Sequence, residues 1–167
     1  LIQTCESRSL KNYNSIVKVL GKPFIVKPAF GHQGVGISLI SSSEEFSHKV
    51  DQQSSNEALL FQEFIPNQGD YRVFVLNHKT QAIMKRVPKK NDFRANFSQG
   101  ASVSCVKDNT ISKILSNAAE IITRALSLEI AGVDLILEST SNQPFFIESN
   151  SIPQWQGLSK ACDINIA

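Results

Sequence analysis

The spacing of apolar residues in the first third of the chain predicts helices that alternate with short strands. Between residues 9 and 20, apolar side chains recur three and four positions apart, as in a helix with one buried face: Leu10, Tyr13, Ile16, Val17 and Leu20. A Gly-Lys-Pro segment at 21–23 is expected to end this helix. Residues 24–26 and 35–40 are predicted strands around a glycine-containing loop, and residues 43–46 are typical of the start of a second helix.

The rest of the chain is mostly strand-like, around one long helix. Three apolar runs predict strands, at residues 59–61, 71–76 and 81–87, and a hairpin turn is expected at residues 77–80. Residues 88–100 predict a loop, and the apolar stripe from Ile111 to Leu126 predicts a helix that Asp108 can cap. Strands at 132–137 and 144–147 are joined by a polar turn. Because successive strands follow one another closely, the expected fold class is α+β with largely antiparallel sheets.

Composition narrows the functional classes. The 167 residues are 41% hydrophobic, which argues against a disordered chain, and 17 basic residues against 15 acidic ones give no argument for a nucleic acid or a membrane surface. No apolar run approaches the roughly 20 residues of a membrane span. Three scattered cysteines without a CxxC pattern predict reduced thiols and a cytoplasmic location. The chain starts without Met and stops within a helical pattern, so it is expected to be truncated at both ends.

Three oxygen-bearing side chains near the C-terminal hairpin predict a metal site. Glu148 and Asn150 are two positions apart, so in a strand they point to the same face. If the turn centres near Ser141, Asp134 lies directly across from Glu148. Carboxylate and amide oxygens are ligands that Mg²⁺ prefers, and no Lys or Arg within the hairpin is placed to neutralise the acids. The alternative is a set of solvated residues at the ends of strands.

A second candidate site follows the first predicted buried strand. Lys27 precedes a loop with three glycines, Gly31, Gly34 and Gly36, that leads straight into another strand. Glycines let backbone amides approach phosphate oxygens, and a lysine supplies a positive charge. The loop matches neither the P-loop nor the Rossmann pattern, so a simple turn is the alternative.

Basic residues are concentrated between positions 72 and 94, among them Arg72, Lys85, Arg86, Lys89, Lys90 and Arg94. Arginine forks suit carboxylate and phosphate ligands, so this segment, expected to be mostly a loop, is a third candidate site. A solvated surface loop is the alternative. A nucleic-acid binder that uses this segment is the least favoured functional hypothesis.

The order of these segments resembles the RimK-like carboxylate–amine ligases of the ATP-grasp superfamily. The resemblance begins near residue 22 and extends to the C-terminus. Its most specific parts are the Asp-Phe-Arg-Ala-Asn segment at 92–96 and the pair formed by Gly-Val-Asp at 132–134 and Glu-Ser-Asn at 148–150, followed by Pro153. The resemblance implies an ATP-grasp fold with two α+β subdomains, residues 1–65 and 66–167, that clasp the nucleotide.

The resemblance also implies roles for individual residues. Those expected to bind ATP are Lys27 at the phosphates, the flap residues Gly31, Gln33, Gly34 and Gly36, the adenine-contacting segment Glu63, Phe64 and Ile65, and Asp70 near the sugar. Arg94 and Asn96 would approach both the phosphates and the reacting carboxylate, as catalytic residues. The metal ligands would be Asp134, Glu148 and Asn150, with Glu148 bridging two Mg²⁺ or Mn²⁺ ions.

The implied activity is ATP-dependent ligation. A carboxylate attacks the γ-phosphate of ATP to give an acyl phosphate, and an amine then displaces phosphate to form an amide. The implied partners are amino acids or peptide or protein termini, without a membrane, and homo-oligomerisation is left open. The family's N-terminal domain and an earlier phosphate-binding lysine are absent from this chain. A non-catalytic or regulatory nucleotide-binding module is therefore the alternative.

Overall fold

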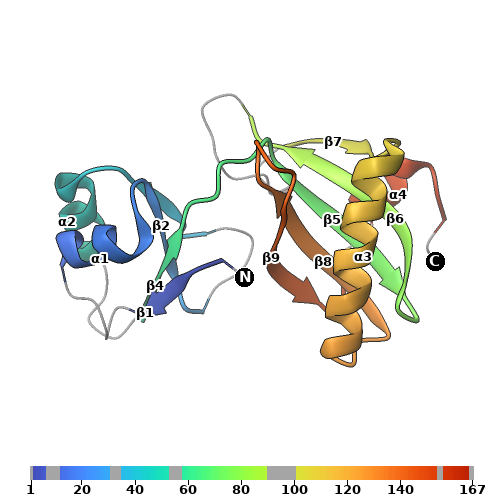
Figure 1. Ribbon diagram of the computed structural model, residues 1–167, viewed down its shortest axis with the longest axis horizontal. Coiled ribbons are helices and arrows are strands. Elements are labelled where there is room, and N and C mark those ends of the chain that lie inside the picture. The colour runs from blue at the N-terminus through green and yellow to red at the C-terminus, as the bar shows by residue number, and fades with distance from the viewer. Residues whose placement is uncertain are drawn as a thin grey trace. The chain divides into compact units, whose positions relative to one another are not determined.

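The computed structural model describes residues 2–6, 12–30, 35–52, 58–89, 101–153 and 156–165. The chain divides into two compact units, Leu1–Ile65 (unit 1) and Pro66–Ala167 (unit 2). Figure 1 shows that each unit combines a β-sheet with helices, so the predicted α+β class is confirmed. No helix in the part of the chain that the structure describes is long and apolar enough to span a membrane.

Unit 1 is built on a sheet in which all neighbouring strands are antiparallel. The strands lie in the order β1-β4-β2-β3, with bounds Thr4–Glu6 for β1, Leu59–Glu63 for β4, Phe24–Pro28 for β2 and Ser38–Ile40 for β3. The helices are α1 (Tyr13–Leu20) and α2 (Ser43–Asp51). The sequence did not predict β1. The strand predicted at 35–40 begins only at Ser38, because Gly36 adopts a positive φ of 78° in a turn.

The core of unit 1 lies between its two helices and one face of the sheet. Asn12 caps α1 by accepting a hydrogen bond from the amide of Ser15 at 2.9 Å, and Ser42 caps α2 in the same way. The helices bury Ile16, Leu20 and Phe46 against Phe24 and Phe61 of the sheet. The rings of Phe24 and Phe61 meet edge to face, with centroids 6.3 Å apart, a favourable aromatic arrangement. The apolar spacing of the sequence therefore identified the buried face of α1 over the described residues.

Unit 2 is a five-stranded antiparallel sheet with helices on both faces. The strand order is β7-β6-β5-β8-β9, with bounds Ser102–Cys105, Lys79–Val87, Asp70–Leu76, Ile130–Leu137 and Pro144–Asn150 in that order. The helices are α3 (Asn109–Ala125), capped by Asp108 as predicted, and α4 (Gln156–Cys162). Strand β7 was not predicted from the sequence.

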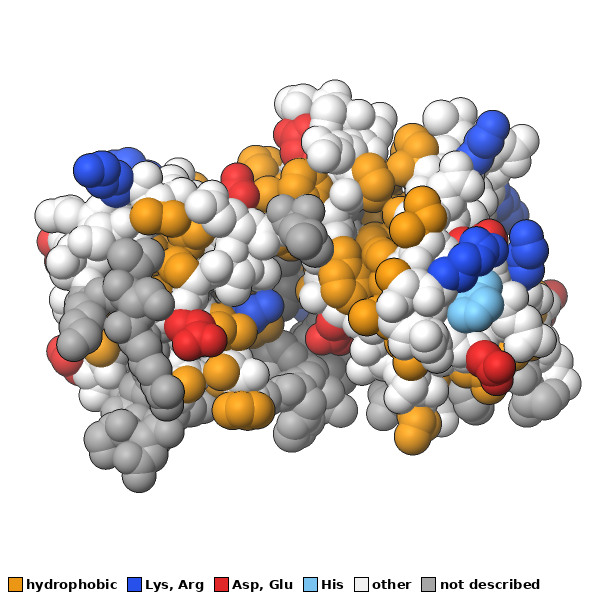
Figure 2. Space-filling view, turned by 60° about the horizontal axis from the view of Figure 1, so that its bottom comes forward, with side chains coloured by type: hydrophobic (Ala, Val, Ile, Leu, Met, Phe, Trp, Pro, Cys, Tyr) orange, Lys and Arg blue, Asp and Glu red, His pale blue; other side chains and the backbone are white. Residues whose placement is uncertain are grey.

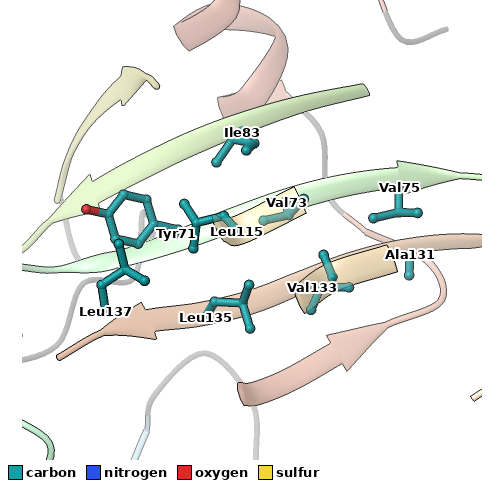
Figure 3. Close-up of a cluster of buried hydrophobic side chains, with 10 residues drawn as sticks. Tyr71, Val73, Val75, Ile83, Leu115, Ala131, Val133, Leu135 and Leu137 are labelled. Atoms are coloured by element: carbon teal, nitrogen blue, oxygen red, sulfur yellow. The ribbon is translucent and has the colours of Figure 1, made fainter. Parts of the chain in front are cut away.

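The two faces of this sheet differ in chemistry. One face is mainly apolar: side chains such as Val73, Val133 and Leu135 pack against Leu115 and Ala119 of α3, as Figure 3 shows for most of this cluster. On the opposite face, Leu158 of α4 packs against Phe74 and Met84 of the sheet. The same face carries the charged side chains of Asp70, Arg72, Arg86 and Asp134, and this part, called the polar face below, carries the candidate site.

The cysteine prediction was wrong for two of the three residues. Cys105 of β7 and Cys162 of α4 form a disulfide that joins positions 57 residues apart. They meet because α4 folds back onto β6 and β7 and buries Leu158 there. Cys5 in unit 1 is a free, half-buried thiol.

Gly69, just before β5, is required by the backbone. Its φ is 104°, and a Cβ at this position would lie 2.2 Å from the carbonyl oxygen of Arg86. Gly69→Ala should therefore lower the free energy of unfolding by about 1–3 kcal/mol, because a backbone contact this close must be relieved. Gly21→Ala is the matched control: φ is 76°, but the space around its Cβ is open. Equal losses in urea unfolding for the two variants would contradict the prediction.

Candidate functional site

The hairpin of β8 and β9 brings the predicted metal ligands to one face. Asp134 pairs with Glu148 and Gly132 pairs with Asn150, so the predicted register is confirmed. The pairing shifts by one residue beyond this point, because Leu135 faces Phe146 rather than Ile147. This β-bulge lets Phe146 point into the α3 core while Glu148, two residues later, points to the polar face.

Asp134 is buried in a fork of arginine side chains. The Nε and Nη2 atoms of Arg72 donate to its two carboxylate oxygens at 2.8 and 2.6 Å, and Nη2 of Arg86 donates to Oδ2 at 2.9 Å. Arg72 comes from β5, directly opposite Asp134. No Lys or Arg of the hairpin neutralises the acids, as expected, but two arginines from strands outside the hairpin neutralise Asp134.

Arg86 completes a buried network of four charges. It lies opposite Asp70 in the β5–β6 pair, and its Nε and Nη2 atoms contact both carboxylate oxygens of Asp70. Burial raises the pKa of Asp70 to about 6, against the opposing effect of Arg86. Burial lowers the pKa of Arg86, but the charges of Asp134 and Asp70 outweigh it, so this pKa lies above its ordinary value. Two positive and two negative charges thus balance within the sheet face.

The basic segment is not a single loop. Arg72 and Arg86 are held in ion pairs, whereas Lys85 points to the opposite face, with its Nζ 5.6 Å from the centre of the Tyr71 ring. Successive residues of a strand point to opposite faces, which separates Lys85 from Arg86. Lys90 and Arg94 lie outside the described residues.

The surface charges of unit 2 are mixed. On the face drawn in Figure 2, basic side chains lie beside acidic ones rather than in one basic stripe. Glu120 contacts both Lys79, at 3.9 Å, and Arg124, at 3.6 Å. These observations do not support the nucleic-acid hypothesis, which requires a continuous basic surface.

Glu148 and Asn150 lie at the exposed end of the polar face. Glu148 is exposed, and Nδ2 of Asn150 donates to its Oε1 at 3.2 Å. Gly132, opposite Asn150, is needed for close approach, because a Cβ there would lie 2.8 Å from Cβ of Pro153. The glycine therefore lets the chain after Asn150 fold back over the sheet.

Asp134, Glu148 and Asn150 fit a hard divalent cation such as Mg²⁺ or Mn²⁺. They offer carboxylate and amide oxygens, the donors that these cations prefer. Asp134 accepts three hydrogen bonds from the arginines, so they use most of the roughly four acceptor positions of its carboxylate. Among the described residues there is no cluster of three His, Cys, Asp or Glu side chains that could hold a metal ion. Their role as ligands stays a prediction.

In unit 1, the predicted nucleotide-binding residues lie on adjacent strands but on different faces. Nζ of Lys27 on β2 donates to Oε1 of Gln62 on β4 at 3.0 Å. Glu63 pairs with the buried Phe24, and its amide donates to the carbonyl of Gln3 at 3.0 Å. Gln62 is thus a neighbour of Lys27 that the sequence analysis did not assign. The alternation of buried Leu59 and Phe61 on β4 was the signal that could have placed it.

The other residues predicted to bind ATP or to act in catalysis lie next to the strands of unit 1 or outside the described residues. Phe64 and Ile65 follow β4 directly, and Ile65 is buried. Gly36 lies in the turn before β3. Five predicted site residues lie outside the described residues: Gly31, Gln33 and Gly34 of the flap, and the catalytic candidates Arg94 and Asn96 of the 88–100 segment.

Solved structures establish the class of fold. The chain superposes on a D-alanine–D-alanine ligase from Bacillus anthracis with a TM-score of 0.74 and 18% identity, over 97% of this chain and 56% of that one. It also matches the ATP-grasp ligase PsnB, complexed with a minimal precursor, with a TM-score of 0.71 and 15% identity, over 99% and 52% of the two chains. The fold is an ATP-grasp fold, as predicted.

Sequence comparison gives the family. The model of the RimK-like ATP-grasp domain matches residues 4–167, so the chain belongs to this family. It is 34% identical over 164 residues to a "probable alpha-L-glutamate ligase" of Parasynechococcus marenigrum, and 34% identical over 155 residues to a protein of the same name in Sodalis glossinidius. These matches cover 96% and 91% of this chain but 34% and 51% of the relatives, so the chain spans between a third and about half of their length.

Proposed function

We propose that the chain is the nucleotide-binding part of an ATP-dependent ligase that joins a carboxylate to an amine. The observation that supports this most is the register that aligns Asp134 with Glu148 on the polar face of a RimK-like domain. The relatives are named as glutamate ligases, and structural neighbours include a D-alanine ligase and a ligase complexed with a peptide precursor. An amino acid, or a peptide or protein terminus, is accordingly the substrate class on each side of the new bond.

The proposed reaction has two steps. A carboxylate oxygen of the first substrate attacks the γ-phosphorus of ATP, and ADP leaves, which gives an acyl phosphate. The amine nitrogen then attacks the acyl carbon, phosphate leaves, and the amine loses a proton as the amide forms. The protein contributes positioning and charge neutralisation rather than a nucleophile of its own.

The residues of this chain would divide that work. Asp134, Glu148 and Asn150 would hold Mg²⁺ or Mn²⁺, with Glu148 shared by two ions, and bound cations would neutralise phosphate oxygens. Lys27, held by Gln62, would bind phosphate, with the flap and the 63–65 segment enclosing the nucleotide. Arg94 and Asn96 would contact the reacting groups. Both carboxylate oxygens of Asp70 contact Arg86. This contact favours a role of Asp70 in positioning Arg86, rather than the predicted role in contacting the sugar of the nucleotide. A cytoplasmic location is part of the same proposal.

The test is ADP release by the full-length protein with pairs of amino acids, followed by mass analysis of the product. Mg-ATP should also raise the melting temperature by ligand linkage.

Glu148→Gln should lower turnover by at least about 100-fold, the scale of losing one strong electrostatic stabiliser, while the fold survives. Its matched control is Glu129→Gln, an exposed acid of the same unit outside the hairpin, which should keep near-normal turnover.

The outcomes separate the hypotheses. Near-normal turnover in Glu148→Gln would end the proposed metal role. Stabilisation by Mg-ATP without ADP release on any substrate pair would favour the regulatory module instead. The absence of any effect of millimolar ATP on the full-length protein would refute nucleotide binding.

A further inference from the structure

Arg72 contacts both carboxylate oxygens of Asp134, and this affects how a cation could reach the carboxylate. Arg72 makes two parallel hydrogen bonds to Asp134, and the side chains are 15% and 5% exposed. A bidentate pair of this kind is among the stronger ion pairs in proteins. The guanidinium of Arg72 therefore contacts the carboxylate oxygens that a cation on Asp134 would contact. Its positive charge neutralises this carboxylate, as a bound cation would.

The two arginines of the network are held differently. Arg86 has a 6% exposed side chain, takes both oxygens of Asp70 and also reaches Asp134, so it contacts two acids at once. The hydrogen bonds of Arg72 go to one acid, Asp134, and its side chain is the more exposed of the two. Arg72 can accordingly leave its carboxylate for another ligand more easily than Arg86 can, and Arg86 would keep its contacts with the two acids.

Charge decides what can displace Arg72. A divalent cation added to Asp134 while both arginines remain would bring like charges together in a poorly solvated position. A phosphate group removes this conflict, because a guanidinium fork fits phosphate oxygens as well as it fits a carboxylate. Cation and phosphate can thus enter together, with Arg72 moving from the carboxylate to the phosphate.

From this geometry we infer that Arg72 is a positioning residue that excludes free divalent cations from Asp134 until a nucleotide phosphate takes over its guanidinium. The inference rests on the proposed function, because it needs nucleotide phosphates at the polar face of unit 2. It assigns Arg72 a role in the order of binding: the site accepts the metal–nucleotide complex and discriminates against the metal alone.

The experiment is Mn²⁺ binding to the full-length protein, measured by electron paramagnetic resonance with and without a non-hydrolysable ATP analogue. The wild-type protein should bind Mn²⁺ weakly alone and at least about tenfold more tightly with the analogue. Arg72→Met removes the charge and should raise the affinity for Mn²⁺ alone by at least about tenfold. Lys79→Met, which removes a charge that is 72% exposed, is the matched control and should leave this affinity unchanged.

A second variant keeps the test valid if Arg72→Met unfolds. Arg72→Lys retains the charge but loses the fork, so its affinity for Mn²⁺ alone should lie between those of the wild-type and Met proteins. A purely structural role for Arg72 predicts the opposite sign, since disturbing the site would weaken Mn²⁺ binding. An unchanged or lower affinity in folded variants, with Mn²⁺–analogue binding intact in the wild type, would overturn this inference alone. A wild-type protein that binds no Mn²⁺ even with the analogue would overturn the proposed function as well.

Discussion

Arg86→Met is expected to lower the free energy of unfolding by about 3–5 kcal/mol, the usual effect of removing one partner from a buried ion pair. The variant leaves the buried carboxylate of Asp70 without the two donors that it contacts, and takes one donor from Asp134. Most of the loss comes from a charge that stays desolvated without compensation, rather than from the attraction itself. Urea unfolding of the isolated variant and wild-type proteins measures the difference.

Two further variants identify the cause. Lys79→Met removes an exposed pair with Glu120 and should change the unfolding free energy by less than about 1 kcal/mol. The double variant Asp70→Leu with Arg86→Met removes both charges, so it should recover much of the stability that the single variant loses. A loss below about 1 kcal/mol in Arg86→Met, or a double variant less stable than the single one, would show that the network does not act in this way.

Cys162→Ser should destabilise the oxidised protein by about 4 kcal/mol. The disulfide closes a loop between positions 57 residues apart, and the chain-entropy relation gives an effect of this size. The disulfide stabilises the protein because it restricts the conformations of the unfolded chain. It also attaches α4 covalently to the sheet. Urea unfolding with and without a thiol reductant measures it.

The reductant provides an internal control. The wild-type protein should lose stability when it is reduced, whereas Cys162→Ser should show no such difference. Cys5→Ser, which alters the free thiol of unit 1, should keep the full difference. A wild-type protein with equal stability in both conditions would contradict the prediction. In a reducing cytoplasm the reduced values would apply.

The local parts of the site could be predicted from the sequence. A polar turn between two apolar runs gave the approximate position of the hairpin, and a turn centred near Ser141 places Asp134 opposite Glu148. In the structure this pair also depends on the β-bulge between Asp134 and Leu135. Periodicity likewise identified the buried face of α3. Each of these inferences depends on residues within one turn or one helix, where spacing carries the information.

The ion network could not be predicted, because its geometry depends on a β-bulge and on distant pairing. Val75 pairs with Thr80 near the β5–β6 turn. If this register continued along the strands without a bulge, Asp70 would lie opposite Lys85. The shift between Phe74 and Val75 moves the pairing by one residue and brings Arg86 opposite Asp70 instead. The contact of Arg72 with Asp134 joins residues 62 apart, beyond the reach of any local pattern. The pairing of Cys105 with Cys162 was missed for the same reason.

The strand order of unit 2 has a consequence for the time course of folding during synthesis. β5 and β6 form a local hairpin, but the other edge of β5 pairs with β8, whose Asp134 is made 62 residues after Arg72. At about 5–20 residues per second, the growing chain carries this hairpin for roughly 3–12 s before its partner exists. During that interval the edge of β5, with Val73, Phe74 and Val75, has unpaired backbone groups and apolar side chains that would suit another chain as well as β8. Slowing translation between residues 76 and 130 should therefore favour aggregation of the nascent protein.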